Sequence, residues 1–392
     1  MAQHPPGPLA PQRAPGQSTG VVGGGRHAAI ILVDRRDFPN RGTLCTMDTH
    51  ATLAQLVTGR PLSASQAETL FEHLLTGALD DAQIGALLAL IQARGPGPDE
   101  LIGAATAMRR HVTRVPIEPS SGQVIIDTCG TGGAPKVFNV STVAAIVVAA
   151  AAGAPDQPGV LVAKHGNRSR TGRGSAEVLE RLGVNVHASP EVQAECLRRT
   201  GVCFCFAIHH HPAMRYAAGP RKSLGFRTIF NLLGPLTNPA GARRQLIGVY
   251  DVALAEPMAR ALSALGAERA IVAHGMDGLD ELTTCAESLL LHVDRGAILR
   301  EHVRPGDLGL APASYDRLAV DSPDQAARVA ESVLRGEPGP HTDITLLNVA
   351  AGLLVAGGVS SLSEGMEKAR EGIDSGRACL VLERLREVSR LS

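Results

Sequence analysis

Residues 124–133 read Val124-Ile125-Ile126-Asp127-Thr128-Cys129-Gly130-Thr131-Gly132-Gly133. The apolar start predicts a buried strand, and the glycines that follow it predict a tight turn. A few residues later the chain reads Phe138-Asn139-Val140-Ser141-Thr142 and continues into a run rich in Ala and Val, which predicts a helix. Strand, glycine loop and helix in this order indicate an α/β fold with a parallel sheet.

The same order recurs further along the chain. Residues 160–163 predict a second strand, a loop begins at Lys164, and residues 175–182 predict a helix. Further strands are expected at residues 184–186, 245–250, 269–273 and 289–293. We therefore expect a mainly parallel central sheet that is covered by helices on both faces.

Two other parts of the sequence look helical. Apolar residues recur at three- and four-residue steps over residues 53–114, and residues 189–236 are also expected to be helical. The predicted fold class is α/β, with a small helical domain built from two separated segments and a larger α/β domain. The predicted boundaries are a disordered tail over residues 1–46, helical segments over 47–118 and 189–238, and α/β segments over 119–188 and 239–392.

Composition excludes several classes of protein. The 392 residues are 44% hydrophobic, which is enough for a core. The 38 basic residues are balanced by 38 acidic ones, so the basic excess of a nucleic-acid-binding protein is missing. No apolar run is long enough to span a membrane. The seven cysteines show no paired metal-binding spacing and favour reduced thiols in a cytoplasmic protein.

The glycine loop and the helix after it favour phosphate binding. Glycine backbone N–H groups can approach an anion closely, and Asn139, Ser141 and Thr142 lie at a helix start, where free N–H groups attract phosphate. An ordinary strand-to-helix turn is the alternative. The glycine spacing matches neither a dinucleotide-binding fingerprint nor a P-loop.

Three further features carry polar groups. Lys164, Asn167 and nearby basic residues directly follow a predicted strand, where α/β sheets bind ligands such as a phosphorylated sugar. Asp280 and Glu281 also follow a predicted strand and can hold a hard cation such as Mg²⁺, although adjacent acids are common by chance. Residues 209–211 are three consecutive histidines, of which we expect one to be functional.

In combination these features resemble the anthranilate phosphoribosyltransferase family, among the nucleoside phosphorylase-type phosphoribosyltransferases. The matching motifs are Lys-His-Gly-Asn-Arg from Lys164, His-Pro-Ala-Met from His211, Arg-Thr-Ile-Phe-Asn-Leu-Leu-Gly-Pro-Leu from Arg227 and Gly-Leu-Asp-Glu-Leu from Gly278. The resemblance runs from about residue 47 to the C-terminus. It implies a Mg²⁺-dependent pentosyltransferase of tryptophan biosynthesis that acts on anthranilate and phosphoribosyl pyrophosphate (PRPP). It also implies a homodimer through the helical domain. From the charge balance and the short apolar runs we expect no nucleic-acid or membrane partner.

The resemblance assigns roles to individual residues. PRPP would be bound by Gly130, Thr131, Gly132, Gly133, Asn139, Ser141, Thr142 and Lys164. Mg²⁺ would be held by Ser141, Asp280 and Glu281, while Asn167, His211 and Arg221 would form the catalytic, anthranilate-binding group. An aryl amine is already neutral at pH 7, so we expect no single essential acid–base residue.

The sequence departs from the family pattern in its phosphate-facing loops. Ala134 stands where the family usually has an acid, Val137 stands where it often has Thr, and two loops each look one residue short. Residues 155–159 look like an insertion. Lys136 or an arginine such as Arg173 would then replace the lost contacts.

These departures leave two alternatives. One is a phosphoribosyltransferase or phosphorylase with a different acceptor, although Asn167, His211 and Arg221 argue against it. The other is a non-catalytic, nucleic-acid-binding relative, against which the zero net charge and the Asp280-Glu281 pair argue.

Overall fold

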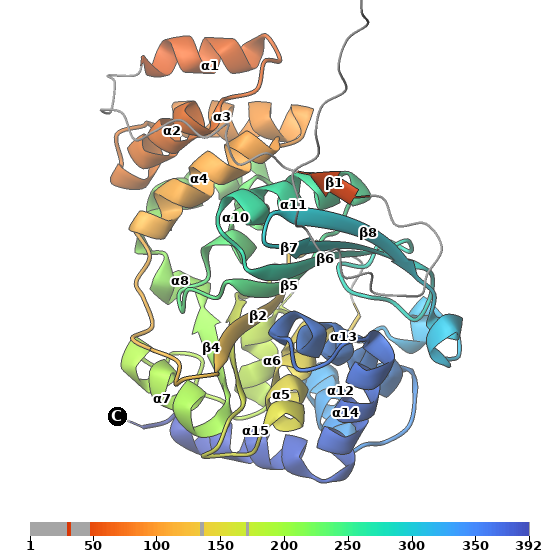
Figure 1. Ribbon diagram of the computed structural model, residues 1–392. Coiled ribbons are helices and arrows are strands. Elements are labelled where there is room, and N and C mark those ends of the chain that lie inside the picture. Colours follow the sequence, from red (N-terminus) through yellow and green to blue (C-terminus); the bar gives the residue numbers. More distant parts are fainter. Residues whose placement is uncertain (1–29, 33–47, 134–136, 170–171, 392) are drawn as a thin grey trace, which may run out of the picture.

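A helical bundle lies at one end of the molecule (Figure 1). The computed structural model describes residues 30–32, 48–133, 137–169 and 172–391. The bundle begins with α1 (Thr49–Val57), α2 (Ala64–Thr76), α3 (Asp81–Arg94) and α4 (Pro98–Arg110). Ser63 and Asp80 start α2 and α3 with capping boxes, which satisfy backbone N–H groups that a helix start leaves unpaired. From far along the chain, α9 (Arg215–Leu224) packs against α2 and α3, which confirms that the helical part is built from two separated segments.

The described strands form one eight-stranded sheet in the order β1-β8-β7-β6-β5-β2-β3-β4. In chain order they are β1 (Ile30–Leu32), β2 (Val124–Gly130), β3 (Val160–Gly166), β4 (Val202–Phe206), β5 (Arg244–Gly248), β6 (Arg269–Gly275), β7 (Ser288–Asp294) and β8 (Ala297–Val303). The neighbours from β4 through β3, β2 and β5 to β6 run parallel, whereas β7, β8 and β1 are antiparallel to their neighbours. The prediction of a mainly parallel central sheet is confirmed.

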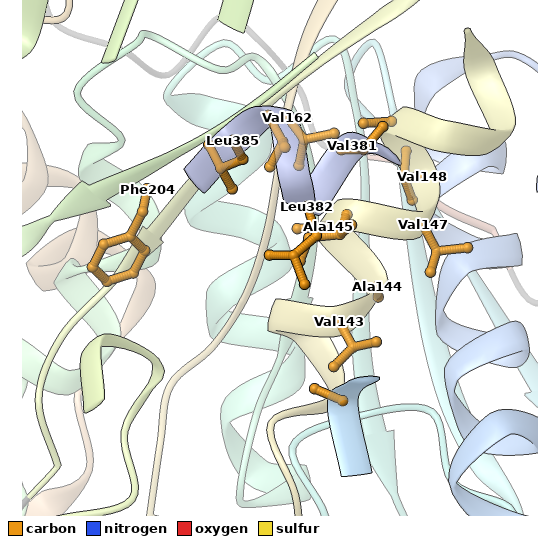
Figure 2. Close-up of a cluster of buried hydrophobic side chains, with 14 of the residues drawn as sticks. Val143, Ala144, Ala145, Val147, Val148, Val162, Phe204, Val381, Leu382 and Leu385 are labelled. Carbon is orange, nitrogen blue, oxygen red and sulfur yellow. The ribbon is translucent and has the colours of Figure 1, made fainter. Parts of the chain in front are cut away.

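Helices cover both faces of this sheet. One face carries α5 (Val140–Ala152), α6 (Ser175–Arg181), α7 (Pro190–Thr200), α12 (Pro323–Leu334), α13 (Pro340–Ala356), α14 (Leu362–Asp374) and α15 (Arg377–Val388). The other face carries α11 (Ala255–Ala264), which also packs against α4 and so joins the bundle to the sheet. Figure 2 shows the core around α5, whose Val143, Ala145 and Val148 belong to the same buried cluster as Val162 of β3 and Leu382 of α15.

Two expectations about secondary structure are wrong. Residues 184–186 form no strand: a turn begins at Val186, and Val184 and Val186 are buried in the core without pairing with the sheet. Residues 189–238, expected to be helical throughout, contain the edge strand β4, whose five buried residues pair with β3. Helix α7, which comes before β4, packs against β3 and β4 and therefore belongs with the sheet.

The predicted disordered tail is described only at Ile30–Leu32. These three residues form β1, which pairs antiparallel with the end of β8. An Ile-Ile-Leu run has high strand propensity and can extend an exposed sheet edge. The rest of residues 1–46 lies outside the described part of the chain.

The candidate site lies at the carboxyl ends of the parallel strands. β2, β3, β5 and β6 each end in a glycine, namely Gly130, Gly166, Gly248 and Gly275. The chain passes from β2 through α5 to β3 on one side, while β5 lies on the other side of β2. Such a switch point opens a crevice at the carboxyl ends of the strands, where open α/β sheets bind ligands.

Candidate active site

The acidic pair lies directly over the glycine loop. Oδ2 of Asp280 accepts a hydrogen bond from the backbone N–H of Gly132 over 2.8 Å, and Oε1 of Glu281 accepts one from the N–H of Ser141 over 3.2 Å. A Cβ on Gly130 would lie 2.5 Å from Oδ2 of Asp280, and a Cβ on Gly248 would overlap the Asp280 backbone. Glycine at the ends of β2 and β5 is therefore what lets the acidic loop approach the sheet.

Burial and mutual repulsion act on the acidic pair. Burial, and then the neighbouring Asp280 carboxylate, raise the pKa of Glu281 to about 8. Lys164, buried in β3, opposes this rise, but its Nζ donates to the Thr128 carbonyl over 2.7 Å. Two adjacent carboxylates beside the Ser141 hydroxyl suit a hard cation such as Mg²⁺, which completes its shell with water and phosphate oxygens. The described residues contain no cluster of three or more His, Cys, Asp or Glu side chains that would form an all-protein metal site.

The start of α5 has polar atoms without partners. Oδ1 of Asn139 and Oγ1 of Thr142 are buried and accept or donate no hydrogen bond within the described part of the chain. Asn139 precedes the first turn of α5 but gives it no side-chain cap. Buried polar groups are nearly always paired, so these two atoms indicate a ligand at a helix start that already favours anions.

The three consecutive histidines have different surroundings. His211 is buried, with Nε2 3.3 Å from Nε2 of His165, and burial lowers the pKa of His211 to about 4. Nδ1 of His165 lies 3.0 Å from the Gly234 carbonyl, which can only accept, so Nδ1 carries the proton. His210 bonds to Thr113 and Gln193 within the fold. His211 is therefore the member of the run that reaches the sheet edge, as a neutral imidazole.

Asn167 and Arg221 stand apart from these contacts. Asn167 is exposed just after β3, and its Oδ1 accepts the N–H of Arg168 over 2.8 Å. Arg221 is half-buried on α9, with its guanidinium 5.1 Å from the ring centroid of Phe230 in α10 (Phe230–Leu233), and burial lowers its pKa. Arg221 donates no hydrogen bond to any described residue, so its five N–H donors are available to a carboxylate.

Sequence reasoning gave no role to two residues of the site. Asp127 is buried in the middle of β2, where its carboxylate accepts from the His165 N–H over 3.1 Å and from Nδ2 of Asn238 over 2.9 Å. An acid in an otherwise apolar strand was a visible signal. Arg227 donates to the Gly133 carbonyl, and no pattern along the chain pointed to that contact.

Comparison with protein families agrees with this architecture. Residues 122–379 match the model described as "Glycosyl transferase family, a/b domain", and residues 51–112 match "Glycosyl transferase family, helical bundle domain". The chain belongs to this glycosyl transferase family.

Within this family the similar proteins are anthranilate phosphoribosyltransferases. The chain is 45% identical to the enzyme of Methylobacterium nodulans, over 86% of this chain and 97% of the relative. It is 44% identical to that of Symbiobacterium thermophilum, over 86% and 96%. This places the chain among the anthranilate phosphoribosyltransferases.

Solved structures agree. The anthranilate phosphoribosyltransferase of Thermus thermophilus matches with a TM-score of 0.78 and 39% identity, over 87% of this chain and 99% of that one. The enzyme of Saccharomyces cerevisiae in complex with PRPP and Mg matches with a TM-score of 0.77 and 25% identity, over 88% and 99%. Among the described helices, none is both long and apolar enough to cross a membrane.

Proposed function

We propose that the crevice between β2 and β5 transfers the 5-phosphoribosyl group of PRPP to the amine of anthranilate, with release of pyrophosphate. The observation that carries this proposal is the contact between a part of the site that favours anions and a part that favours cations. A glycine loop and helix start suited to anions lie against an acidic pair suited to a cation. A magnesium complex of a pyrophosphate ester needs both at the same place.

The PRPP subsite consists of the loop Gly130-Thr131-Gly132-Gly133, the α5 start at Asn139, Ser141 and Thr142, and Lys164. The unpartnered buried oxygen atoms of Asn139 and Thr142 support it. We assign Mg²⁺ to Asp280, Glu281 and Ser141, where it would neutralise charge on the departing pyrophosphate. The raised pKa of Glu281 supports this assignment, because a carboxyl held above its usual range gains most from a nearby cation.

The anthranilate subsite is assigned to Asn167, His211 and Arg221. Arg221 is the natural partner of the anthranilate carboxylate, because guanidinium and carboxylate groups match as two-pronged donors and acceptors. His211 is neutral at pH 7, and its Nδ1 can accept a hydrogen bond from the aryl amine.

The residues act mainly by positioning. As the amine nitrogen bonds to C1 of the ribose, the C1–O bond to pyrophosphate breaks, and the pyrophosphate takes the electron pair. The nitrogen then loses a proton to solvent. Backbone N–H groups of the loop and α5 stabilise the negative charge that develops on the leaving group, while holding the amine in line supplies much of the remaining rate.

The changes in the phosphate-facing loops relative to the family pattern do not alter the proposed reaction. The Arg173 side chain donates to the Val320 carbonyl, and its backbone carbonyl accepts from Nδ2 of Asn139, so Arg173 stabilises its loop through contacts with the protein. Ala134, Lys136 and Arg170 lie outside the described residues. A different acceptor remains the alternative, and the assay below separates the two.

We also propose a cytoplasmic homodimer that associates through the helical domain. Val57 on α1 is 70% exposed, which leaves an apolar side chain on the bundle for a second copy. The cysteines in the described part of the chain are free thiols, which fits the reducing cytoplasm. Analytical ultracentrifugation gives the mass directly, and a monomer at micromolar concentration would contradict this assembly.

The test is the fluorescence of anthranilate mixed with purified protein, PRPP and Mg²⁺. We expect the anthranilate signal to fall with time, and the fall to stop when EDTA removes the metal. Asp280→Ala serves as the inactive control. A folded wild-type protein that consumes neither anthranilate nor PRPP would contradict the proposal, and PRPP turnover only with another acceptor would identify the alternative.

A further inference from the structure

Arg227 joins three segments at the edge of the proposed PRPP subsite. It lies between α9 and α10, in the helical part of the chain. Its guanidinium donates a hydrogen bond to the Gly133 carbonyl and lies 4.1 Å from the ring centroid of Tyr250, just after β5. An exposed arginine is thus held by an aromatic face on one side and by the glycine loop on the other.

Gly133 and Arg227 fit each other sterically. Gly133 has a φ of 97°, in the region that favours glycine. A Cβ at this position would overlap the guanidinium of Arg227, so only a glycine allows the approach. A second contact holds the same loop, because Asp280 accepts the N–H of Gly132.

We propose that Arg227 is a positioning residue for the reaction: with Tyr250 as its support, it fixes the Gly132–Gly133 backbone in the conformation that receives the pyrophosphate of PRPP. This inference rests on the proposed function. Two physical reasons carry it. A glycine-rich loop loses much conformational freedom when it is ordered, and a loop that is already fixed loses less on binding. A backbone carbonyl that faced the pyrophosphate would repel it, and the guanidinium holds this carbonyl in a hydrogen bond instead.

The molecule offers a matched control. Arg215 is also exposed and also covers a tyrosine ring, with its guanidinium 4.5 Å from the ring centroid of Tyr216 and a hydrogen bond to the Tyr216 hydroxyl. It belongs to the same helical segment as Arg227 but makes no hydrogen bond to the glycine loop. Arg227→Ala and Arg215→Ala therefore remove the same kind of side chain, and only the first removes the contact with Gly133.

The first measurement is hydrogen–deuterium exchange of a peptide that covers residues 130–133 in the full-length protein without substrates. We expect faster exchange in Arg227→Ala and in Tyr250→Leu than in wild type, and no change in Arg215→Ala. Arg227→Lys should be intermediate, because lysine keeps the charge but lacks the planar fork. Unchanged exchange in Arg227→Ala would overturn the proposal.

The second measurement compares the KM values of the two substrates. Fixing the backbone of one residue corresponds to roughly a tenfold change in a binding constant, so the KM for PRPP should rise about tenfold in Arg227→Ala. The KM for anthranilate should stay within about twofold. A higher KM for PRPP with unchanged exchange would mean that Arg227 contacts PRPP directly, which overturns a positioning role. An inactive wild-type protein would contradict the proposed function only, because the exchange measurement needs no turnover.

Discussion

Oδ2 of Asp280 lies 2.8 Å from the backbone nitrogen of Gly132 and accepts its hydrogen bond across 148 positions of sequence. Glu281 makes the same kind of contact with the N–H of Ser141. The acids assigned to the metal therefore occupy the N–H groups assigned to the phosphates. Any cation that draws these carboxylates away also releases those N–H groups for an anion, so we expect Mg²⁺ and PRPP to bind cooperatively.

Asp280→Asn tests the charge of the acidic pair while keeping its shape. We expect kcat/KM to fall on the order of 100-fold and the Mg²⁺ concentration for half-maximal rate to rise, because one carboxylate is lost beside the departing pyrophosphate. Steady-state kinetics over a Mg²⁺ titration measure both. Asp277→Asn is the control, because Asp277 accepts hydrogen bonds from Leu279 and Thr283 within the same loop. Equal losses in the two variants would contradict the assignment.

Gly130→Ala tests whether the glycine at the end of β2 makes room for Asp280. The added Cβ would lie 2.5 Å from Oδ2 of Asp280 and must displace that carboxylate. A displacement of about 1 Å can cost on the order of 100-fold in rate, so we expect a comparable loss of kcat/KM. Gly85→Ala on α3 meets nothing within 4 Å. It should keep full activity and raise the free energy of unfolding by about 0.5–1 kcal/mol. Full activity of Gly130→Ala would contradict the claim that a Cβ at position 130 displaces the Asp280 carboxylate.

Arg221→Ala should weaken anthranilate binding, whereas His210→Ala should mainly lower stability. Removing Arg221 leaves the anthranilate carboxylate without its partner, so the KM for anthranilate should rise about 10- to 100-fold, as expected for a charged hydrogen bond. His210 bonds to Thr113 and Gln193, so its loss should lower the free energy of unfolding by about 1–3 kcal/mol with a smaller effect on kcat/KM. Kinetics and urea unfolding of each variant give the comparison. Similar kcat/KM losses in both would contradict this ranking.

The buried histidine pair should make stability fall in acid. Burial lowers the pKa of His211 from 6.5 to about 4. Burial also lowers the pKa of His165 well below 6.5. Between these pH values the unfolded chain binds the proton and the folded chain does not, so the free energy of unfolding decreases as the pH falls from 6.5 toward 4.

His211→Gln should remove part of that pH dependence. Between about pH 7.5 and about pH 5, the loss of stability should be smaller by about 2 kcal/mol in the variant than in wild type. Urea unfolding at the two pH values measures the difference, and comparing slopes corrects for any constant destabilisation by the glutamine. The same pH slope in both proteins would show that His211 is not the buried titrating group.

Much of the fold could be predicted because its signals are local. The strand β2 begins with three consecutive apolar residues, the glycines at its end mark a turn, and an Ala- and Val-rich run then forms α5. The edge strand β4 was missed, because a five-residue apolar run between helices can form either a buried strand or part of a helix. Only pairing with β3, about 40 positions earlier in the chain, decides between them.

By itself the sequence determined the glycine loop, the helix start and the positions of Asp280 and Glu281 after a strand, because each depends on a few neighbouring residues. Only the tertiary structure decided that Asp280 covers Gly130 and Gly248, and that Arg227 reaches a carbonyl 94 positions away. Such contacts arise when strands align at one sheet edge and a helical segment packs beside it. No local sequence pattern predicts these contacts, because the two residues of each contact lie far apart in the chain and meet only in the folded protein.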